Sequence, residues 1–258
     1  MPFDPKLGVH CASDLRFEYD SDVFGPAPEF RHLDDIRRSL RDPHCQGPDP
    51  VYSIGMDVGR TEHLQELQRR MLLVGVVAYE AGQLGEEPVR SQGHIHAIAP
   101  HCGWSTPELF EIWEGQAIIY AQERATDDPG RCFAVTANPG EKVVVPPNWA
   151  HCVINADPAR RMVFGAFCDR QYGFVYDEVR AHGGLAWFPV LDVQQQIHWE
   201  PNPKYQTSNI SVGSPRAYPD LGLIPNVAMY EQFAEDPHSL QWVSEPARVK
   251  DVWNAFEP

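Results

Sequence analysis

The stretch from Gly93 to Gly115 reads GHIHAIAPHCGWSTPELFEIWEG and carries two histidines one residue apart. Successive side chains of a β-strand point to opposite faces, so His94 and His96 would share one face of a strand. Two imidazoles on one face can bind one metal ion, although an H-x-H pair alone is a weak indication of a metal site. The candidates for a further ligand from this stretch are Glu108, Glu111 and His101.

Short strands separated by turn signals surround this stretch, from about Val76 to Val190. The apolar or alternating segments are PELFEIWEGQAIIYAQE, RCFAVTA, KVVVP, HCVIN and RMVFGAF, and the turns between them are TDDPG, NPGE, PNWA and ADPAR. Such regular spacing without long helices between the strands predicts an antiparallel sandwich or barrel.

The segments on either side of this region mix short predicted helices with strands and irregular chain. Leu33, Ile36 and Leu40 have helical spacing, with aspartates early and arginines late in the segment, which predicts a short helix. TEHLQELQRRM predicts another helical turn or two before a buried strand at 71–79. Beyond Asp192 the chain is rich in Pro, Asn, Gln and Trp, and a short helix is predicted near 227–234.

These patterns predict one structural domain with three parts. The parts are an N-terminal arm that packs on the barrel (1–75), the barrel itself (76–190) and a C-terminal wrapping extension (191–258). With 258 residues, 43% of them apolar, the chain is long enough to bury a sizeable core.

The composition narrows the classes of function. A net charge of −15 argues against a nucleic-acid or anionic-membrane surface. The longest apolar run, MLLVGVVAY, is about half the ~20 residues that a membrane span needs, and no secretion signal follows Met1. Six cysteines without a C-x-x-C pair predict reduced thiols. We therefore expect a cytoplasmic protein without nucleic-acid or membrane partners.

Two segments together resemble the two cupin signatures. The first signature is a glycine, H-x-H, a glutamate, six residues and a glycine, and the second is GEKVVVPPNWAHCVIN at Gly140–Asn155, with Asn148 where glycine is usual. The resemblance implies an all-β cupin (double-stranded β-helix or jelly-roll) barrel with short helices in the arm and the tail. The metal ligands that it implies are His94, His96, Glu108 and His151. Such a set suits one divalent ion per chain, Fe²⁺, Mn²⁺, Ni²⁺ or Zn²⁺, with positions left open for substrate.

The first signature departs from the usual pattern in two ways. The gap between His96 and Glu108 is longer than usual, so AIAPHCGWST is expected to form an inserted loop at the barrel mouth. Pro88 also stands where the signature usually begins with glycine. Glu108 is preferred to Glu111 and His101 because its distance to Gly115 is the usual one. Strand alternation then turns Glu108, Phe110 and Ile112 inward and Glu111 and Trp113 outward.

A narrower resemblance covers about Asp49 to Gly184. DPVYSI, the first signature and VVVPPNWAHCVIN are similar to the cupin-type glucose-6-phosphate isomerases. This resemblance implies a homodimer, a divalent metal, and aldose–ketose isomerisation of a small-molecule sugar or sugar phosphate. It also implies catalytic roles for Glu108 and Tyr52. The substrate-binding residues that it implies are Ser91, Gly93, Tyr176 and Asn148.

The phosphate-binding positions of that family are only partly present. The family has threonines where this chain has Val76 and Ser91, a histidine where it has Phe174, and a tyrosine where it has Asn148. A bound phosphate needs charge-assisted or backbone hydrogen-bond donors, and the side chains of valine and phenylalanine have none. The metal chemistry therefore looks preserved, whereas phosphate recognition looks altered.

Three functional hypotheses follow. The leading one is a metal-dependent cupin isomerase that acts on a sugar or sugar phosphate through an enediol. The second is a metalloenzyme of the same family recruited to another reaction of specialised metabolism, as an Fe(II) dioxygenase, an epimerase or a lyase. The third is a non-catalytic sugar-binding cupin. One scaffold hosts all three functions, so the fold alone does not decide between them.

Overall fold

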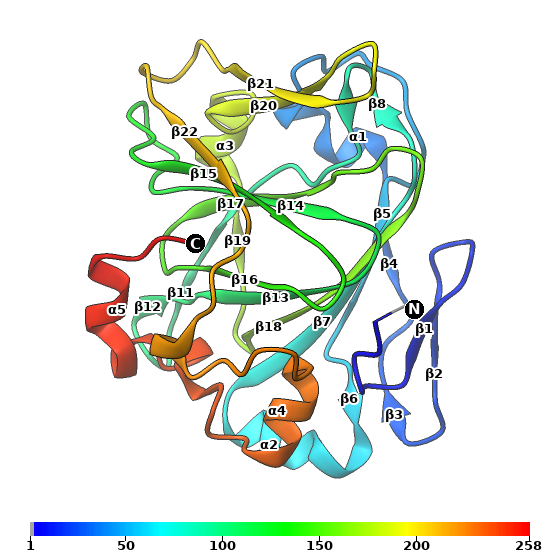
Figure 1. Cartoon of the computed structure of the whole chain (residues 1–258), viewed down its shortest axis with the longest axis vertical. Coiled ribbons are helices and arrows are strands. Elements are labelled where there is room, and N and C mark those ends of the chain that lie inside the picture. The colour runs from blue at the N-terminus through cyan, green and yellow to red at the C-terminus, as the bar shows by residue number, and fades with distance from the viewer. Residues whose placement is uncertain (1–2) are drawn as a thin grey trace.

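The computed structural model describes residues 3–258 and is built around two mainly antiparallel β-sheets that enclose a barrel (Figure 1). The larger sheet has the order β16 (Lys142–Val145), β13 (Glu108–Glu114), β18 (Met162–Asp169), β7 (Leu72–Tyr79), β5 (Tyr52–Met56) and β4 (Glu29–Arg31). The smaller sheet has the order β17 (Ala150–Asn155), β14 (Ala117–Gln122), β15 (Cys132–Ala137) and β22 (Ile210–Gly213), of which β22 runs parallel to β15. The predicted cupin barrel is confirmed.

Several short strand pairs form separate two-stranded sheets in addition to the two main sheets. They are β1 (Val9–Cys11) with β2 (Phe17–Tyr19), β3 (Val23–Phe24) with β6 (Gly59–Arg60), β8 (Gln83–Leu84) with β9 (Glu87–Pro88), β10 (Ile95–His96) with β19 (Phe174–Val175), β11 (Ile98–Ala99) with β12 (Trp104–Ser105), and β20 (Trp187–Leu191) with β21 (Ile197–Pro201). The β11–β12 hairpin is the inserted loop expected from the long gap after His96. Single bridges from Arg90 to Ile154 and from His94 to His151 tie the segment before β10 to β17.

The helices are short and lie outside the barrel. They are α1 (Leu33–Ile36), η1 (Arg37–Ser39), η2 (Thr61–His63), α2 (Leu64–Arg69), α3 (Asp177–Ala181), η3 (Pro219–Leu221), α4 (Met229–Glu235), η4 (Gln241–Val243), η5 (Pro246–Val249) and α5 (Lys250–Asn254). The helices predicted near 33–40, 61–71 and 227–234 are present, the first as one α-turn followed by a 3₁₀ turn. In Figure 1 the C-terminal segment descends from β22 to α4, which lies beside α2.

Apolar side chains form three layers. Inward-facing residues of both sheets, such as Phe110, Ile119 and Phe164, fill the barrel. The outer face of the larger sheet packs against the arm and the C-terminal helices, and the outer face of the smaller sheet packs against α3 and β20. Strand β7 is buried at every position because both of its faces are covered. Residues 1–75 and 191–258 contribute β4, β5 and β22 to the two sheets, and the three-part division of the domain stays a prediction.

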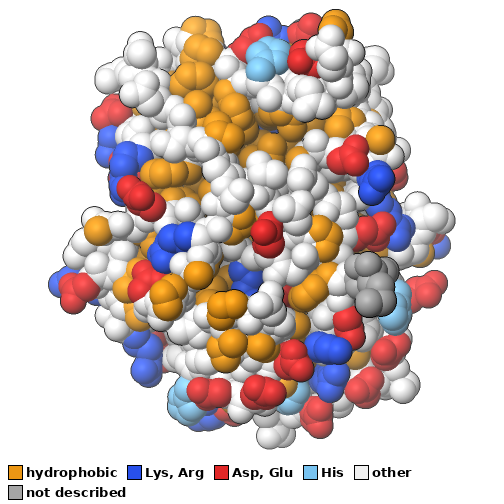
Figure 2. Space-filling view, in the orientation of Figure 1, with side chains coloured by type: hydrophobic (Ala, Val, Ile, Leu, Met, Phe, Trp, Pro, Cys, Tyr) orange, Lys and Arg blue, Asp and Glu red, His pale blue; other side chains and the backbone are white. Residues whose placement is uncertain are grey.

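The surface carries basic, acidic and apolar side chains. On the face in Figure 2, basic side chains are scattered among acidic ones, and apolar side chains gather in its upper half. Val212 of β22 is one of the exposed apolar side chains. No helix within residues 3–258 combines the length and apolar character needed to cross a bilayer. All six cysteines are free.

A buried polar cluster attaches the C-terminal segment to the outer face of the larger sheet. Glu111, on the outward face of β13 as predicted, accepts a hydrogen bond from the backbone N–H of Met229 at 2.8 Å and one from Trp113 Nε1 at 3.2 Å. Lys142 Nζ lies 3.8 Å from Glu111 Oε1 and donates to the carbonyl of Val227 at 2.5 Å. These contacts hold the start of α4 against β13 and β16.

The ionisation of Glu111 makes this attachment sensitive to pH. Burial raises the pKa of Glu111 from its ordinary 4.5 to about 7, although the Met229 N–H and the Lys142 ammonium oppose the rise. The folded chain therefore holds this proton more tightly than the unfolded chain does. Its contribution to stability is fully present below pH 4.5 and is lost as the pH rises to about 7. The full effect is about 3 kcal/mol.

We expect Glu111→Gln to flatten the pH dependence of the unfolding free energy between pH 4.5 and about 7 relative to wild type. A glutamine oxygen still accepts the Met229 N–H, so the variant should fold. The measurement is denaturant unfolding at a series of pH values. The matched control is Glu114→Gln on the same strand, where the side chain is about half exposed and pairs with Arg161. An unchanged slope in Glu111→Gln would contradict the assignment.

Candidate metal centre

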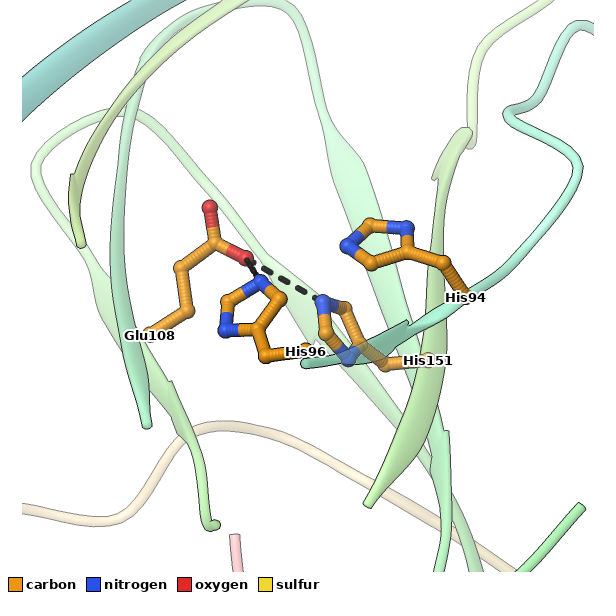
Figure 3. A group of neighbouring side chains, drawn as sticks. All are labelled: His94, His96, Glu108 and His151. Atoms are coloured by element: carbon orange, nitrogen blue, oxygen red, sulfur yellow. Dashed lines mark hydrogen bonds and ion pairs between the residues drawn. The ribbon is translucent and has the colours of Figure 1, made fainter. Parts of the chain in front are cut away.

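Four side chains from three parts of the chain converge at one end of the barrel interior. His94 and His96 come from the β10 segment, Glu108 from the first residue of β13, and His151 from β17. One ligand atom from each residue lies within 4.8 Å of all the others. Figure 3 shows the three imidazole rings and the carboxylate facing a common space. The structure therefore brings together the four residues that the two signatures indicated.

The spacing of these atoms suits one first-row metal ion. Glu108 Oε2 lies 3.1 Å from His151 Nε2 and 3.2 Å from His96 Nε2. The ring centroids of His94 and His151 are 4.4 Å apart. Metal–ligand distances of about 2.0–2.2 Å place adjacent ligand atoms roughly 3 Å apart and opposite ones roughly 4 Å apart. The two contacts of Glu108 have the spacing of adjacent ligands, and all four ligand atoms lie within 4.8 Å of one another.

Backbone carbonyls orient two of the imidazoles. His96 Nδ1 lies 2.9 Å from the carbonyl oxygen of Thr106, and His151 Nδ1 lies 3.2 Å from that of Trp149. A carbonyl only accepts, so each Nδ1 carries the proton and each Nε2 presents its lone pair to the common space. Metal-binding histidines usually donate the N–H of their other ring nitrogen to such an acceptor.

Two of the ring nitrogens are buried without a hydrogen-bond partner. They are Nε2 of His94 and Nε2 of His96, whose contact with Glu108 is close but poorly aligned for a hydrogen bond. An unpartnered buried polar atom costs about 1–3 kcal/mol, which a coordinated ion would relieve. The donor set therefore fits a divalent metal.

The protonation states also suit coordination. Burial, with a smaller effect of His151 and His96, holds the pKa of His94 well below its usual value, so this ring is neutral. Burial alone would raise the pKa of Glu108, but the close approach of His151 and His96 outweighs it and holds that pKa below its usual range. Neutral imidazole and ionised carboxylate are the forms that bind metals.

The two other candidate ligands lie elsewhere. Glu111 points to the outer layer, where it holds the start of α4. His101 lies in the turn between β11 and β12, with its Nε2 3.1 Å from Asp169 Oδ2. Both are therefore outside the four-residue cluster, and strand alternation explains the difference between Glu108 and Glu111.

A cavity opens from the cluster into the barrel. Tyr52, Ser91 and Tyr176 line it, together with His94, Glu108 and His151. The Tyr52 ring stacks on Tyr79 with the ring centroids 4.8 Å apart. Ser91 Oγ accepts the backbone N–H of Val153 at 3.1 Å, which leaves its own proton available for donation. Three of the residues expected to act on the substrate thus share the space beside the metal cluster, while their roles stay predictions.

The two remaining predicted substrate-binding residues do not line the cavity. Gly93 has a φ of +89°, and a Cβ there would lie 2.9 Å from Leu185 Cδ1, so both conformation and space favour glycine. Asn148 is exposed in the turn between β16 and β17, with a φ of +67°, and its N–H donates to Ser105 Oγ. Asparagine tolerates positive φ better than other non-glycine residues, which explains its presence where glycine is usual.

Val76, which stands where the family has a threonine, does not face the cavity. Its side chain is fully buried in the outer layer of the larger sheet. Its neighbours Gly75 and Val77 face the cavity instead, because side chains alternate along β7. Neither has a side-chain donor. Phe174 does line the cavity, and its ring lies 4.3 Å from that of His94.

The walls of the cavity are largely apolar. The apolar lining includes Ile54, Met56, Val77, Phe110, Phe164 and Phe174. The sequence did not predict the one cationic residue among the described lining residues. Arg31 also lines the cavity, from β4 in the N-terminal arm. No motif marks Arg31 in the sequence, because only the pairing of β4 with β5 brings it beside Tyr52.

We expect the purified chain to bind one divalent ion, and His151→Ala to lose it. Removal of one of four ligands should lower the metal content well below one per chain and abolish the rise in Tm that added Mn²⁺ or Zn²⁺ causes in wild type. The measurements are elemental analysis after dialysis and thermal unfolding with and without metal. His198→Ala, which removes a half-exposed histidine far along the chain, is the matched control. Equal metal content in His151→Ala and wild type would rule out this site.

Comparison with solved structures gives only distant similarities. An oxalate oxidase aligns at 15% identity with a TM-score of 0.32, over 41% of this chain and 45% of that chain. A variant of Bacillus subtilis oxalate decarboxylase aligns at 17% identity and 0.35, over 50% and 28%. Vicilin from Corylus avellana (hazelnut) aligns at 11% identity and 0.36, over 50% and 32%. The alignments thus span less than half the length of each of these proteins.

Comparison at the level of families is more informative. No curated protein matches the chain closely enough to serve as a relative. The family model of glucose-6-phosphate isomerase matches residues 38–206, which is more than half of the chain and includes all four residues of the metal cluster. Combined with the cupin barrel and its two signatures, this match shows that the chain belongs to the cupin-type glucose-6-phosphate isomerase family.

Proposed function

We propose that the protein is a metal-dependent isomerase that interconverts the aldose and ketose forms of a sugar phosphate through an enediolate. The observation that carries this proposal is the set of three histidines and one glutamate at the cavity, within a chain of this isomerase family. The expected homodimer stays a prediction.

Glu108 is positioned to move the proton. Both of its contacts with histidines use Oε2, which leaves Oε1 free to face the substrate. As an ionised carboxylate it accepts the proton from the carbon next to the carbonyl and returns it to the former carbonyl carbon. The hydroxyl proton passes between the two oxygens, so the isomerisation needs no oxidant. A divalent ion held by His94, His96, Glu108 and His151 would supply positive charge that polarises the substrate oxygens and stabilises the enediolate.

Tyr52 supports this chemistry as a neutral donor. Burial raises its pKa well above the ordinary value, and the nearby Arg31 only partly opposes the rise. The hydroxyl therefore keeps its proton at neutral pH and can donate a hydrogen bond to a substrate oxygen. Stacking on Tyr79 fixes the direction of the ring.

A second candidate function follows from the walls of the cavity. Sugar hydroxyls need hydrogen-bond partners, yet much of this lining is apolar. This favours a smaller or less polar substrate than glucose 6-phosphate. A member of the family recruited to another reaction, as an epimerase, a lyase or an Fe(II) dioxygenase, would use the same metal cluster.

We expect the metal-loaded protein to convert fructose 6-phosphate into glucose 6-phosphate. Glu108→Gln should lower kcat by roughly 10²- to 10⁴-fold, because it removes the base that moves the proton. A coupled assay of glucose 6-phosphate measures the rate, and the metal content of each variant shows whether the ion is retained. Glu114→Gln, on the same strand and half exposed, is the matched control.

Failure of that assay would have distinct meanings. A chain that holds one metal ion but leaves hexose and pentose phosphates unchanged would refute the isomerase proposal. Oxygen uptake with another substrate would then support the dioxygenase alternative. Tight sugar binding without any turnover would support a non-catalytic role.

A further inference from the structure

One cationic side chain faces the cavity beside the metal cluster. Among the described residues that line this cavity, Arg31 is the only lysine or arginine. It lies outside residues 38–206, the part of the chain that matches the family model. Its side chain is 23% exposed, so the guanidinium is largely withdrawn from water while it remains at the edge of the cavity.

Strand pairing directs Arg31 toward the cavity. Its Cα is the direct partner of Tyr52 in the β4–β5 ladder, and directly opposite residues of an antiparallel pair project from the same face. Tyr52 in turn is paired with Tyr79, and both of these tyrosines line the cavity. Strand β4 is at the edge of the larger sheet, and Arg31 lines the cavity from this strand.

The charge of Arg31 is only partly engaged. Among the described residues its ion-pair partner is Glu29, two residues away on the same face, whose side chain is 68% exposed. Nη1 of the guanidinium donates to that carboxylate, and the other N–H donors have no partner among the described residues. The guanidinium has five N–H donors, so an incoming anion can bind without displacing Glu29 completely.

Tyr176 connects this charge with the metal cluster. Its ring centroid lies 6.0 Å from that of His94, and burial raises its pKa while the charge of Arg31 opposes the rise. Arg180 lies 4.7 Å above the same ring and donates to Gln92 Oε1 at 2.8 Å, which fixes both side chains at the cavity. Tyr176 thus lies near both His94 and the charge of Arg31.

We propose that Arg31 binds the anionic group of the substrate, a phosphate or a carboxylate, at the end remote from the metal cluster. The guanidinium would replace the side-chain donors that Gly75, Val77 and Phe174 lack. Two parallel N–H···O bonds match the oxygens of either anion. The proposal rests on the proposed function for the placement of the reacting carbons, but the anion site itself is tested without turnover.

The test is a binding titration with the metal-loaded full chain. Inorganic phosphate and acetate are the probes, and the dose-dependent rise in Tm reports binding. We expect at least one anion to bind wild type and to bind Arg31→Gln roughly 10- to 100-fold more weakly, as expected when charge-assisted hydrogen bonds are lost. Arg31→Lys should restore part of the affinity. Arg38→Gln, an exposed arginine outside this cavity, should leave binding unchanged.

The outcomes separate this proposal from the isomerase assignment. Stronger binding of phosphate identifies a phosphorylated substrate, and stronger binding of acetate identifies a carboxylate. Equal affinity of wild type and Arg31→Gln, or no binding of either anion to wild type, would overturn the proposal. Metal content and the Tm without anion confirm that each variant is folded. A chain that loses anion binding in Arg31→Gln but does not isomerise sugar phosphates would retain this site and refute the isomerase assignment.

Discussion

The structure depends on the convergence of three imidazoles and one carboxylate inside an apolar barrel. Two imidazole nitrogens are buried there without partners, and Glu108 is the nearest charge to His96 and His151. Burial of such groups is unfavourable unless something coordinates them. The cluster is therefore a feature that hydrophobic packing alone does not explain, and a divalent ion would satisfy its unpartnered polar atoms.

The rest of the fold holds these four side chains in place. The bridge between His94 and His151 joins two ligands directly, and carbonyls of Thr106 and Trp149 orient His96 and His151. Both outer faces of the barrel are covered, the larger sheet by the arm and the C-terminal helices and the smaller by α3 and β20. Strands β13 and β17, which carry Glu108 and His151, are thus covered on their outer faces, which gives this part of the site a rigid frame.

The cavity combines a preserved metal cluster with altered walls. A sugar phosphate isomerase needs a base, a metal site and recognition of the anionic end of its substrate. In the proposed function Glu108 would be the base and the four-residue cluster would hold the metal, whereas Val77 and Phe174 offer no side-chain donors for the anionic end. Arg31, which lines the cavity from a segment outside the family match, would supply donors for the anionic end in our proposal.

The sequence alone indicated the four residues of the candidate metal site, because they stand at the matching positions of the two cupin signatures. Strand alternation with a period of two distinguishes Glu108 from Glu111, and the turn signals between apolar segments predicted the barrel. Three features became visible only in the folded chain. Arg31 lies beside Tyr52, and Val77 rather than Val76 lines the cavity. The start of α4 is attached to Glu111. These depend on which strands pair, in which register, and on contacts between residues up to 118 positions apart. Local periodicity carries no information about such pairing, because it is set by packing across the whole chain.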